Sequence, residues 1–306
     1  MHHSIRHITT FQYSSPISQS IMEIRMQPLG NGAQRCLAFK AATDPPSHLF
    51  QYHDYLGNIV HHFDIPERHS RLTITAESVV STRPAPSLRD ALDSEAWDAL
   101  DAMAAAGDHG DMLSPSVFAR PSELLRELAF DLGVSRSNDP LTTLRELSSG
   151  INMAFEYCQK STRVDSPIEE ALQDRRGVCQ DFSHIMIALA RGLGIPCRYV
   201  SGYLYHRLED RDRSAADATH AWVEALLPDI GWIGLDPTND MIAGERHVRV
   251  AIGRDYGDVP PTKGVFQGVA ESTLEVAVQV APFDPPSSEE AIPDKMPTEA
   301  GWSDQQ

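Results

Sequence analysis

The first 82 residues alternate apolar and polar positions in short segments, a pattern typical of strands that are buried on one face. Residues 20–26 (SIMEIRM) are one such segment. Strands are predicted at residues 7–13, 20–26, 33–43, 50–55, 59–63 and 71–82. Residues 56–58 (LGN) form a hairpin-type turn between two of them. Since proline, glycine and asparagine separate the segments, we expect an antiparallel sheet or sandwich over residues 1–82.

Helical periodicity replaces this alternation after residues 83–87 (RPAPS), whose composition is typical of a linker. Residues 88–106 are rich in Ala, Asp and Leu and predict a helix, and another is predicted at residues 122–132. A further helix is expected at residues 141–160. Its buried face is marked by apolar residues three or four positions apart, namely Leu144, Leu147, Ile151, Phe155 and Cys158.

These patterns divide the chain into four parts. We expect a β-rich N-terminal domain over residues 1–82 and a linker or variable helical segment over residues 83–114. A second, core domain is expected over residues 115–283. Residues 284–306 are polar and rich in proline and acidic side chains, so they bury too little apolar surface to fold, and we expect a disordered tail.

The acidic composition restricts the partners of the protein. Acidic residues outnumber basic residues by 43 to 26, which gives a net charge of −17, so a phosphate backbone is repelled and nucleic acid is not expected as a partner. No apolar stretch approaches the roughly 20 residues of a membrane helix, and no signal-peptide h-region is visible. The four cysteines form no CxxC pair. We therefore expect a cytoplasmic protein without a membrane partner, and the number of subunits stays open.

The segment richest in candidate chemistry begins at Gly177. Cys179 opens a strongly periodic helix, which the sequence GLGIP at residues 192–196 ends. A cysteine in the first turn of a helix lies at the positive end of the helix dipole, which favours the thiolate. The unpaired backbone N–H groups of that turn can also receive an oxyanion. For a lone cysteine, a small buried residue at a helix start is the more frequent interpretation.

Two downstream segments favour a catalytic interpretation. Residues 219–225 (THAWVEA) alternate as a strand with His220 near its start, and residues 232–236 (WIGLD) form a short strand that ends at Asp236. The connection between them contains proline and glycine, so the two strands can pair as antiparallel neighbours. Asp236 is then placed to orient the imidazole of His220 toward Cys179, the arrangement of a nucleophile, a base and an orienting carboxylate.

In these motifs the chain resembles the bacterial transglutaminase-like superfamily. The most specific matches are residues 177–184 (GVCQDFSH), 194–203 (GIPCRYVSGY), 220–224 (HAWVE) and 236–239 (DPTN), with a continuation at residues 243–256. Residues 5–7, 55–58 and 76–78 resemble the β-rich region that often precedes this core. The resemblance implies an α+β fold. An N-terminal antiparallel β-sandwich-like domain is followed by a papain-like core, in which a helix bearing Cys179 packs on an antiparallel sheet bearing His220 and Asp236.

The resemblance also implies roles for the site residues. Cys179 is expected as the nucleophile, His220 as the general base and acid, and Asp236 as the orienting carboxylate. The backbone N–H of Cys179 is expected to donate to the oxyanion, and Tyr157 to line the site. The family implies no cofactor and no metal. The residues themselves suggest one weaker metal candidate, the cluster His53, Asp54, His61 and His62, although adjacent histidines on a strand point to opposite faces.

Three functions fit these residues. The first is hydrolysis of an amide or isopeptide bond in a peptide or protein substrate through an acyl-thioester on Cys179. The second is protein-glutamine transglutamination, with the same acylation followed by transfer to an amine. The third is a non-catalytic adaptor that binds peptides, against which the complete set of Cys179, His220 and Asp236 argues. We favour hydrolysis, because water is always available as the acceptor unless a site excludes it.

Overall fold

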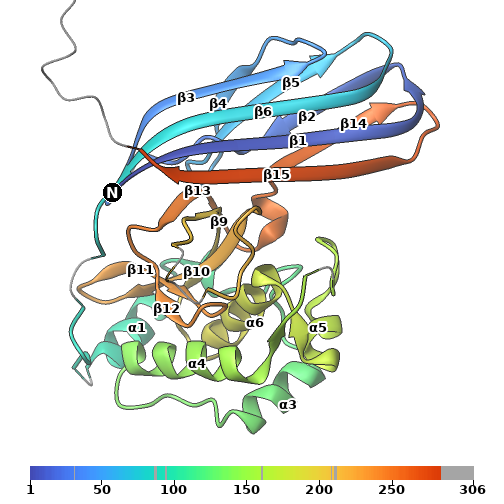
Figure 1. Cartoon of the computed structure of the whole chain (residues 1–306). Coiled ribbons are helices and arrows are strands. Elements are labelled where there is room, and N and C mark those ends of the chain that lie inside the picture. The colour runs from blue at the N-terminus through green and yellow to red at the C-terminus, as the bar shows by residue number, and fades with distance from the viewer. Residues whose placement is uncertain are drawn as a thin grey trace, which may run out of the picture.

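Two four-stranded antiparallel sheets pack face to face in the computed structural model and form the upper half of the molecule (Figure 1). The first sheet consists, in spatial order, of β15 (Ser272–Pro282), β1 (His2–Ile17), β6 (His69–Thr82) and β3 (Gln34–Asp44). The second consists of β14 (Thr262–Gln267), β2 (Gln19–Ile24), β5 (Ile59–Ile65) and β4 (Phe50–His53). Apolar side chains from both sheets fill the space between them, including Tyr13, Ile17, Met22, Ile24, Phe63, Ile65, Leu72 and Ile74. This β-sandwich confirms the fold predicted for the N-terminal region.

The alternation along β2 shows why these sequences form strands. Met22 and Ile24 are buried between the sheets, whereas Ile21 between them is exposed. Burial of each inward apolar side chain contributes roughly 1.5–3 kcal/mol, and a shift by one residue would expose all of them. The pattern of apolar positions therefore sets both the strand and its register.

The last two strands return to the sandwich from the far end of the sequence. Strand β14 pairs with β2, and β15 pairs with β1 along nearly its whole length. The core expected over residues 115–283 therefore extends too far toward the C-terminus. In the structure, residues 262–282 belong to the sandwich, because they pair with the edges of β1 and β2. The structure describes residues 1–30, 32–85, 88–93, 95–159, 161–207, 209 and 212–283, and the predicted tail at 284–306 lies outside these residues.

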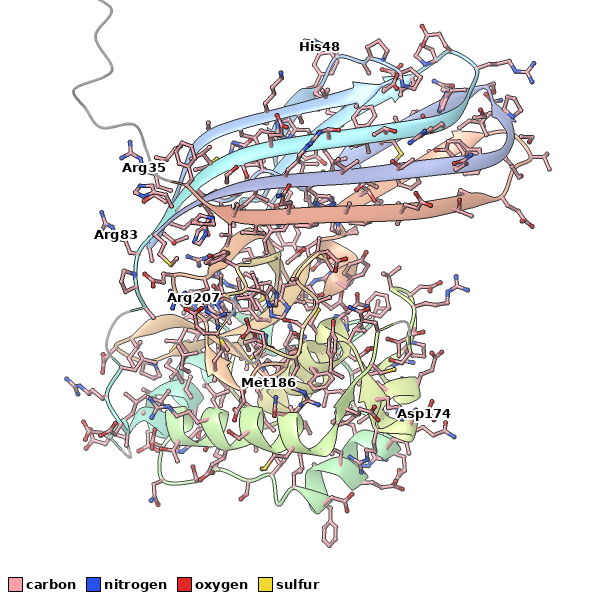
Figure 2. The ribbon with its side chains drawn as sticks, in the orientation of Figure 1. Arg35, His48, Arg83, Asp174, Met186 and Arg207 are labelled. Carbon is pink, nitrogen blue, oxygen red and sulfur yellow. The ribbon has the colours of Figure 1, made fainter. Side chains whose placement is uncertain are left out.

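The lower half of the molecule, here called the α+β core, surrounds a five-stranded antiparallel sheet (Figure 1). Its strands, in spatial order, are β12 (Met241–Ile242), β11 (Gly231–Asp236), β10 (His220–Leu227), β9 (Cys197–Leu204) and β13 (His247–Gly253). Helix α6 (Cys179–Gly192) packs on β9 and β10. Figure 2 shows Met186 of this helix inside the core, where it is fully buried. The expected arrangement of a Cys179 helix on an antiparallel sheet is confirmed.

The other helices cover α6 and close the apolar interior. They are α1 (Ala96–Ala105), α2 (Gly110–Leu113), α3 (Glu123–Asp131), α4 (Pro140–Ala154), α5 (Ile168–Asp174) and the short 3₁₀ helix η1 (Tyr256–Asp258). Helix α1 lies within the predicted linker 83–114, but its Trp97 and Leu100 are buried in the interior of the core. No helix among the described residues is both long and apolar enough to cross a membrane.

Helix α4 is shorter than its apolar periodicity predicts. It begins after Asp139, whose carboxylate accepts the backbone N–H groups of Leu141 and Thr142, and it ends at Ala154 instead of residue 160. The chain then extends into β7 (Glu156–Tyr157), which pairs with β8 (Arg176–Gly177). Cys158 follows β7 and is partly exposed, so the expectation of a helical core position for it was wrong.

The sandwich and the α+β core are joined by buried contacts that fix their relative position. Two side-chain amides of the sandwich form the kind of paired hydrogen bonds with the β13 backbone that a neighbouring strand would form. Gln34 bonds the backbone N–H and carbonyl of Arg249 at 2.7 and 2.8 Å. Asn58 bonds both backbone groups of Ile252 at 2.8 Å. The His7 ring also bonds the Tyr203 hydroxyl at 2.9 Å. These hydrogen bonds therefore hold the sandwich and the α+β core in one fixed arrangement.

Candidate active site

Cys179 is the first residue of α6, and the chain before it is held in place by a side chain of the same helix. Asp181 accepts the backbone N–H of Val178 at 2.8 Å and the hydroxyl of Thr162 at 2.6 Å. Gly177 permits this approach, because a Cβ atom there would lie 2.8 Å from the Asp181 Cβ. Cys179 is partly exposed, and the first-turn N–H groups have no partner within the helix. The position has the helix-dipole environment that the sequence predicted.

His220 begins β10, and Asp236 ends the neighbouring β11. The structure brings them together: the His220 Nε2 lies 2.8 Å from the Asp236 Oδ2, with both side chains buried. The His220 Nδ1 is buried and has no hydrogen bond of normal geometry among the described residues. Cys179 and His220 line the same cleft, so this second nitrogen is available to the thiol.

The charge state of His220 depends on its neighbours. Burial alone lowers its pKa, but the charge and hydrogen bond of Asp236, with further contributions from Cys179, raise it to about 10. Burial would likewise raise the pKa of Asp236, but His220 and the hydrogen bonds of His220 and His247 hold it well below its usual range. His220 is therefore an imidazolium at neutral pH, the form that stabilises a neighbouring thiolate.

Hydrogen-bond donors other than His220 also orient the Asp236 carboxylate. Its Oδ1 accepts the backbone N–H groups of Thr238 and Asn239 at 3.0 and 3.2 Å. Its Oδ2 accepts the Asn239 side-chain amide at 2.8 Å in addition to His220. Asn239 also accepts the backbone N–H of Arg213, which ties the loop before β10 to the same carboxylate. The buried charge is thus well compensated.

His247 is a further member of this cluster that the sequence analysis left without a role. Its Nδ1 accepts the backbone N–H of Gly244 at 3.2 Å, so the ring proton resides on Nε2. That Nε2 donates to the Asp236 Oδ2 at 3.2 Å. Burial lowers the pKa of His247, which keeps it neutral. His247 lies within residues 243–256, which resemble the family's continuation, but no spacing in the sequence links it to Asp236.

His220, Asp236 and His247 also place three potential metal-ligand atoms within 4.8 Å of one another. The same atoms form the two histidine–aspartate hydrogen bonds, so a cation there would have to displace both ring protons. The other metal candidate, the cluster of His53, Asp54, His61 and His62, does not form one site. His61 and His62 lie on opposite faces of β5, since His61 is buried and His62 is exposed. Asp54 accepts hydrogen bonds from the following turn, which explains it as a turn residue.

The cleft that contains Cys179 and His220 lies between the α+β core and the sandwich and has a volume of about 380 Å³. Tyr157 lines it, as predicted, although from β7 instead of a helix. The Tyr157 hydroxyl accepts the backbone N–H of Ala215 at 3.3 Å, and burial raises its pKa to about 12. The sandwich contributes five residues, namely His7, Thr9, Thr262, Leu274 and Val276. The sequence did not predict a wall formed by the sandwich.

A cysteine at a helix start, beside a histidine that a buried aspartate orients from an antiparallel sheet, is the layout of a papain-related core. The comparisons agree with it. The Transglutaminase-like superfamily matches residues 127–237, and the Bacterial transglutaminase-like N-terminal region matches residues 3–81. An uncharacterized protein of Mycobacterium leprae is 33% identical over 278 residues, which are 90% of this chain and 96% of that protein. The chain belongs to the transglutaminase-like superfamily, and its predicted resemblance to this family is confirmed.

Two further similarities concern shorter or more distant relationships. A protein-glutamine gamma-glutamyltransferase of Pseudomonas aeruginosa is 35% identical over 98 residues, which are 30% of this chain and 14% of that protein. The solved structure of a "Putative Cysteine Protease" from Cytophaga hutchinsonii superposes with a TM-score of 0.68 at 22% identity. The superposition covers 93% of this chain and 92% of that one, so both halves of the fold recur there.

Proposed function

We propose that the protein is a thiol enzyme that hydrolyses amide or isopeptide bonds of peptides or proteins through an acyl-thioester on Cys179. The observation that carries the proposal is the buried His220–Asp236 pair, joined at 2.8 Å, which opens onto the same cleft as a cysteine at a helix N-terminus. A structural cysteine has no need of a histidine held in this way. The complete arrangement argues against the non-catalytic adaptor.

The proposed acylation assigns one role to each of these groups. The Cys179 thiolate attacks the carbonyl carbon of the substrate, and the backbone N–H of Cys179 donates to the oxygen that becomes negative. The His220 imidazolium gives its proton to the departing nitrogen as the carbon–nitrogen bond breaks. An amine leaves, and the acyl group stays on sulfur as a thioester. Asp236 stabilises the imidazolium before this proton transfer.

Deacylation uses the same residues in the reverse order. Neutral His220 accepts a proton from water, whose oxygen attacks the thioester carbon. The carbon–sulfur bond then breaks, which releases a carboxylic acid and restores the thiolate–imidazolium pair. Several residues that line the cleft, including Asp217 and Leu274, are exposed, so solvent reaches the site. This exposure favours water as the acceptor.

Transfer to an amine is the second candidate outcome of the same acyl-enzyme. The observation in its favour is the similarity to the protein-glutamine gamma-glutamyltransferase over 98 residues, a segment that spans a minor part of each chain. The two outcomes share the roles of Cys179, His220 and Asp236 and differ only in the nucleophile of the second step. We further propose the cytoplasm as the location, since all four cysteines are free.

The test is to trap the acyl-enzyme and identify its product. The protein is incubated with a panel of peptide and glutamine-containing substrates, and intact mass and peptide mapping locate any thioester. We expect it on Cys179, with release of a carboxylic acid that persists when a primary amine is added. Cys179→Ala abolishes the adduct, whereas Cys158→Ala, a matched change at a partly exposed cysteine outside the cleft, retains it. Turnover that survives Cys179→Ala in a folded protein would refute the thiol mechanism.

A further inference from the structure

Strand β15 lies at the edge of the first sheet, with β1 as its only neighbouring strand in the described part of the chain. In Figure 1 this red strand forms the lower border of the sandwich, above the α+β core. Two of its residues, Leu274 and Val276, line the cleft that contains Cys179. An unpaired sheet edge therefore borders the candidate active site, and such an edge can pair with another extended chain.

The register determines which backbone groups of β15 are free. The strand pairs with β1 without a bulge. The Val278 N–H donates to the carbonyl of Asp217 at 3.1 Å and so points away from β1. Backbone groups alternate in direction along an antiparallel strand, so the N–H and carbonyl groups of Val276 and Leu274 also point away from β1. No described residue forms a hydrogen bond with them on that side.

The chain itself already uses one position of this edge. Asp217, which accepts the Val278 N–H, lies three residues before His220 in the loop that leads into β10. The next outward positions along the edge are Val276 and Leu274, beside the cleft. A peptide strand at these positions would continue the pairing that Asp217 begins and would share the cleft with Cys179.

The side chains of the cleft indicate which peptide fits. Leu274 and Val276 are 50% and 45% exposed, and Val164 from the core side of the cleft is 56% exposed. Burial lowers the pKa of His7 on the sandwich wall to about 4, so this ring is neutral. Asp217 is the one carboxylate among the described lining residues. The exposed aliphatic side chains of both walls therefore favour aliphatic residues of a bound peptide.

We propose that the acyl donor is an extended, aliphatic-rich peptide segment that pairs as an added strand with the free edge of β15 at Leu274 and Val276. This inference rests on the proposed function, because it concerns the substrate of the same cleft. The backbone pairing would provide affinity, and the apolar walls would select aliphatic residues at alternate positions of the peptide. The sandwich is then a part of the substrate site.

The test compares two reagents on the full chain. Iodoacetamide is too small to pair with a strand, so its rate of reaction with Cys179 measures the reactivity of the thiol without any contribution from strand pairing. The second reagent is an acetyl-Val-Ala-Leu-Gln chloromethyl ketone, from which the thiolate displaces chloride to form a carbon–sulfur bond. Methylation of single backbone nitrogens of this probe removes one donor at a time. We expect labelling of Cys179 to slow about three- to tenfold when alternate positions are methylated, and to stay unchanged at the intervening positions.

A pair of protein variants tests the same pairing by removing N–H groups from β15 instead of from the probe. Val276→Pro removes the outward N–H without removing a hydrogen bond to β1. Val280→Pro makes the same change on the same edge, beyond the Asp217 contact and outside the cleft. We expect the ratio of peptide-probe to iodoacetamide rates to fall about three- to tenfold for Val276→Pro and to stay at the parental value for Val280→Pro.

The outcomes separate this inference from the proposed function. If Cys179 reacts with both reagents but all methylated probes label equally fast, pairing with β15 is wrong and the thiol mechanism stands. A stable dimer in which the Leu274 and Val276 amides are protected from hydrogen exchange would also overturn it, since a second copy would occupy the edge. A Cys179 that reacts no faster than Cys158 with iodoacetamide would overturn the proposed function and this inference with it.

Discussion

Replacement of Asp236 by asparagine tests the electrostatics of the site most directly. The carboxylate accepts five hydrogen bonds, two on Oδ1 and three on Oδ2. In Asp236→Asn, the amide oxygen can keep the two backbone donors of Oδ1, but the NH₂ group then faces the donors of Oδ2. His220 must turn its acceptor nitrogen toward this NH₂ and carry its proton on Nδ1. That nitrogen can then no longer accept the proton of the Cys179 thiol.

The magnitude follows from the charge that His220 loses. Its pKa rises from the ordinary 6.5 to about 10 despite burial, a rise that corresponds to roughly 5 kcal/mol of added stabilisation of the imidazolium. Most of it depends on the Asp236 charge. Loss of only about 3 kcal/mol of this stabilisation already corresponds to a hundredfold change in rate. We therefore expect acylation of Cys179 at pH 7 to slow on the order of a hundredfold or more in Asp236→Asn.

The pH dependence of stability provides a second readout. His220 has a raised pKa in the folded chain, so its contribution is complete below pH 6.5 and is lost as the pH rises through about 10. Asp236 has a lowered pKa, so its contribution is present above about 3.8 and is lost at lower pH. The difference in thermal midpoint between the parent and Asp236→Asn should be largest between these limits, at pH 4–6.5, and should shrink toward pH 10.

The assay measures both the labelling rate of Cys179 and the thermal midpoint from pH 4 to 10. The matched control is Asp240→Asn, the same substitution in the same turn, where the carboxylate accepts the hydroxyl of Ser149 at 2.7 Å. It should retain parental labelling. An Asp236→Asn protein that folds and labels Cys179 within threefold of the parental rate at pH 7 would refute the electrostatic reasoning.

Three further predictions concern the surroundings of the site. Gly177→Ala should slow labelling of Cys179 and cost roughly 1–3 kcal/mol in urea unfolding, because the new methyl group meets Asp181; an unchanged rate would contradict this. His247→Phe should lower the unfolding free energy by roughly 1–3 kcal/mol through loss of a donor to a buried carboxylate, and equal stability would show that the donor is dispensable. In the folded protein at pH 8, Cys197 should remain unalkylated while Cys179 reacts, since burial raises the pKa of Cys197 to about 12; equal labelling of both cysteines argues against the structure.

The sequence by itself determined the features that depend on neighbouring residues. Alternation predicted the six sandwich strands within residues 1–82, and periodicity predicted the helix that Cys179 begins, because each pattern reflects which face of one element is buried. The short connection between the strands of His220 and Asp236 predicted that they pair. Their catalytic roles remain predictions, although the structure places the two side chains in contact.

Tertiary structure alone decided the features that join distant parts of the chain. Helix α4 ends at Ala154 because the residues that follow pair with β8, a contact that periodicity cannot report. His247 reaches Asp236 only after β13 has joined the sheet. Strand β15 returns to β1 across more than two hundred residues and becomes a wall of the cleft. Such pairings depend on which edges are free once the rest has folded, so the pattern within any one segment does not determine them.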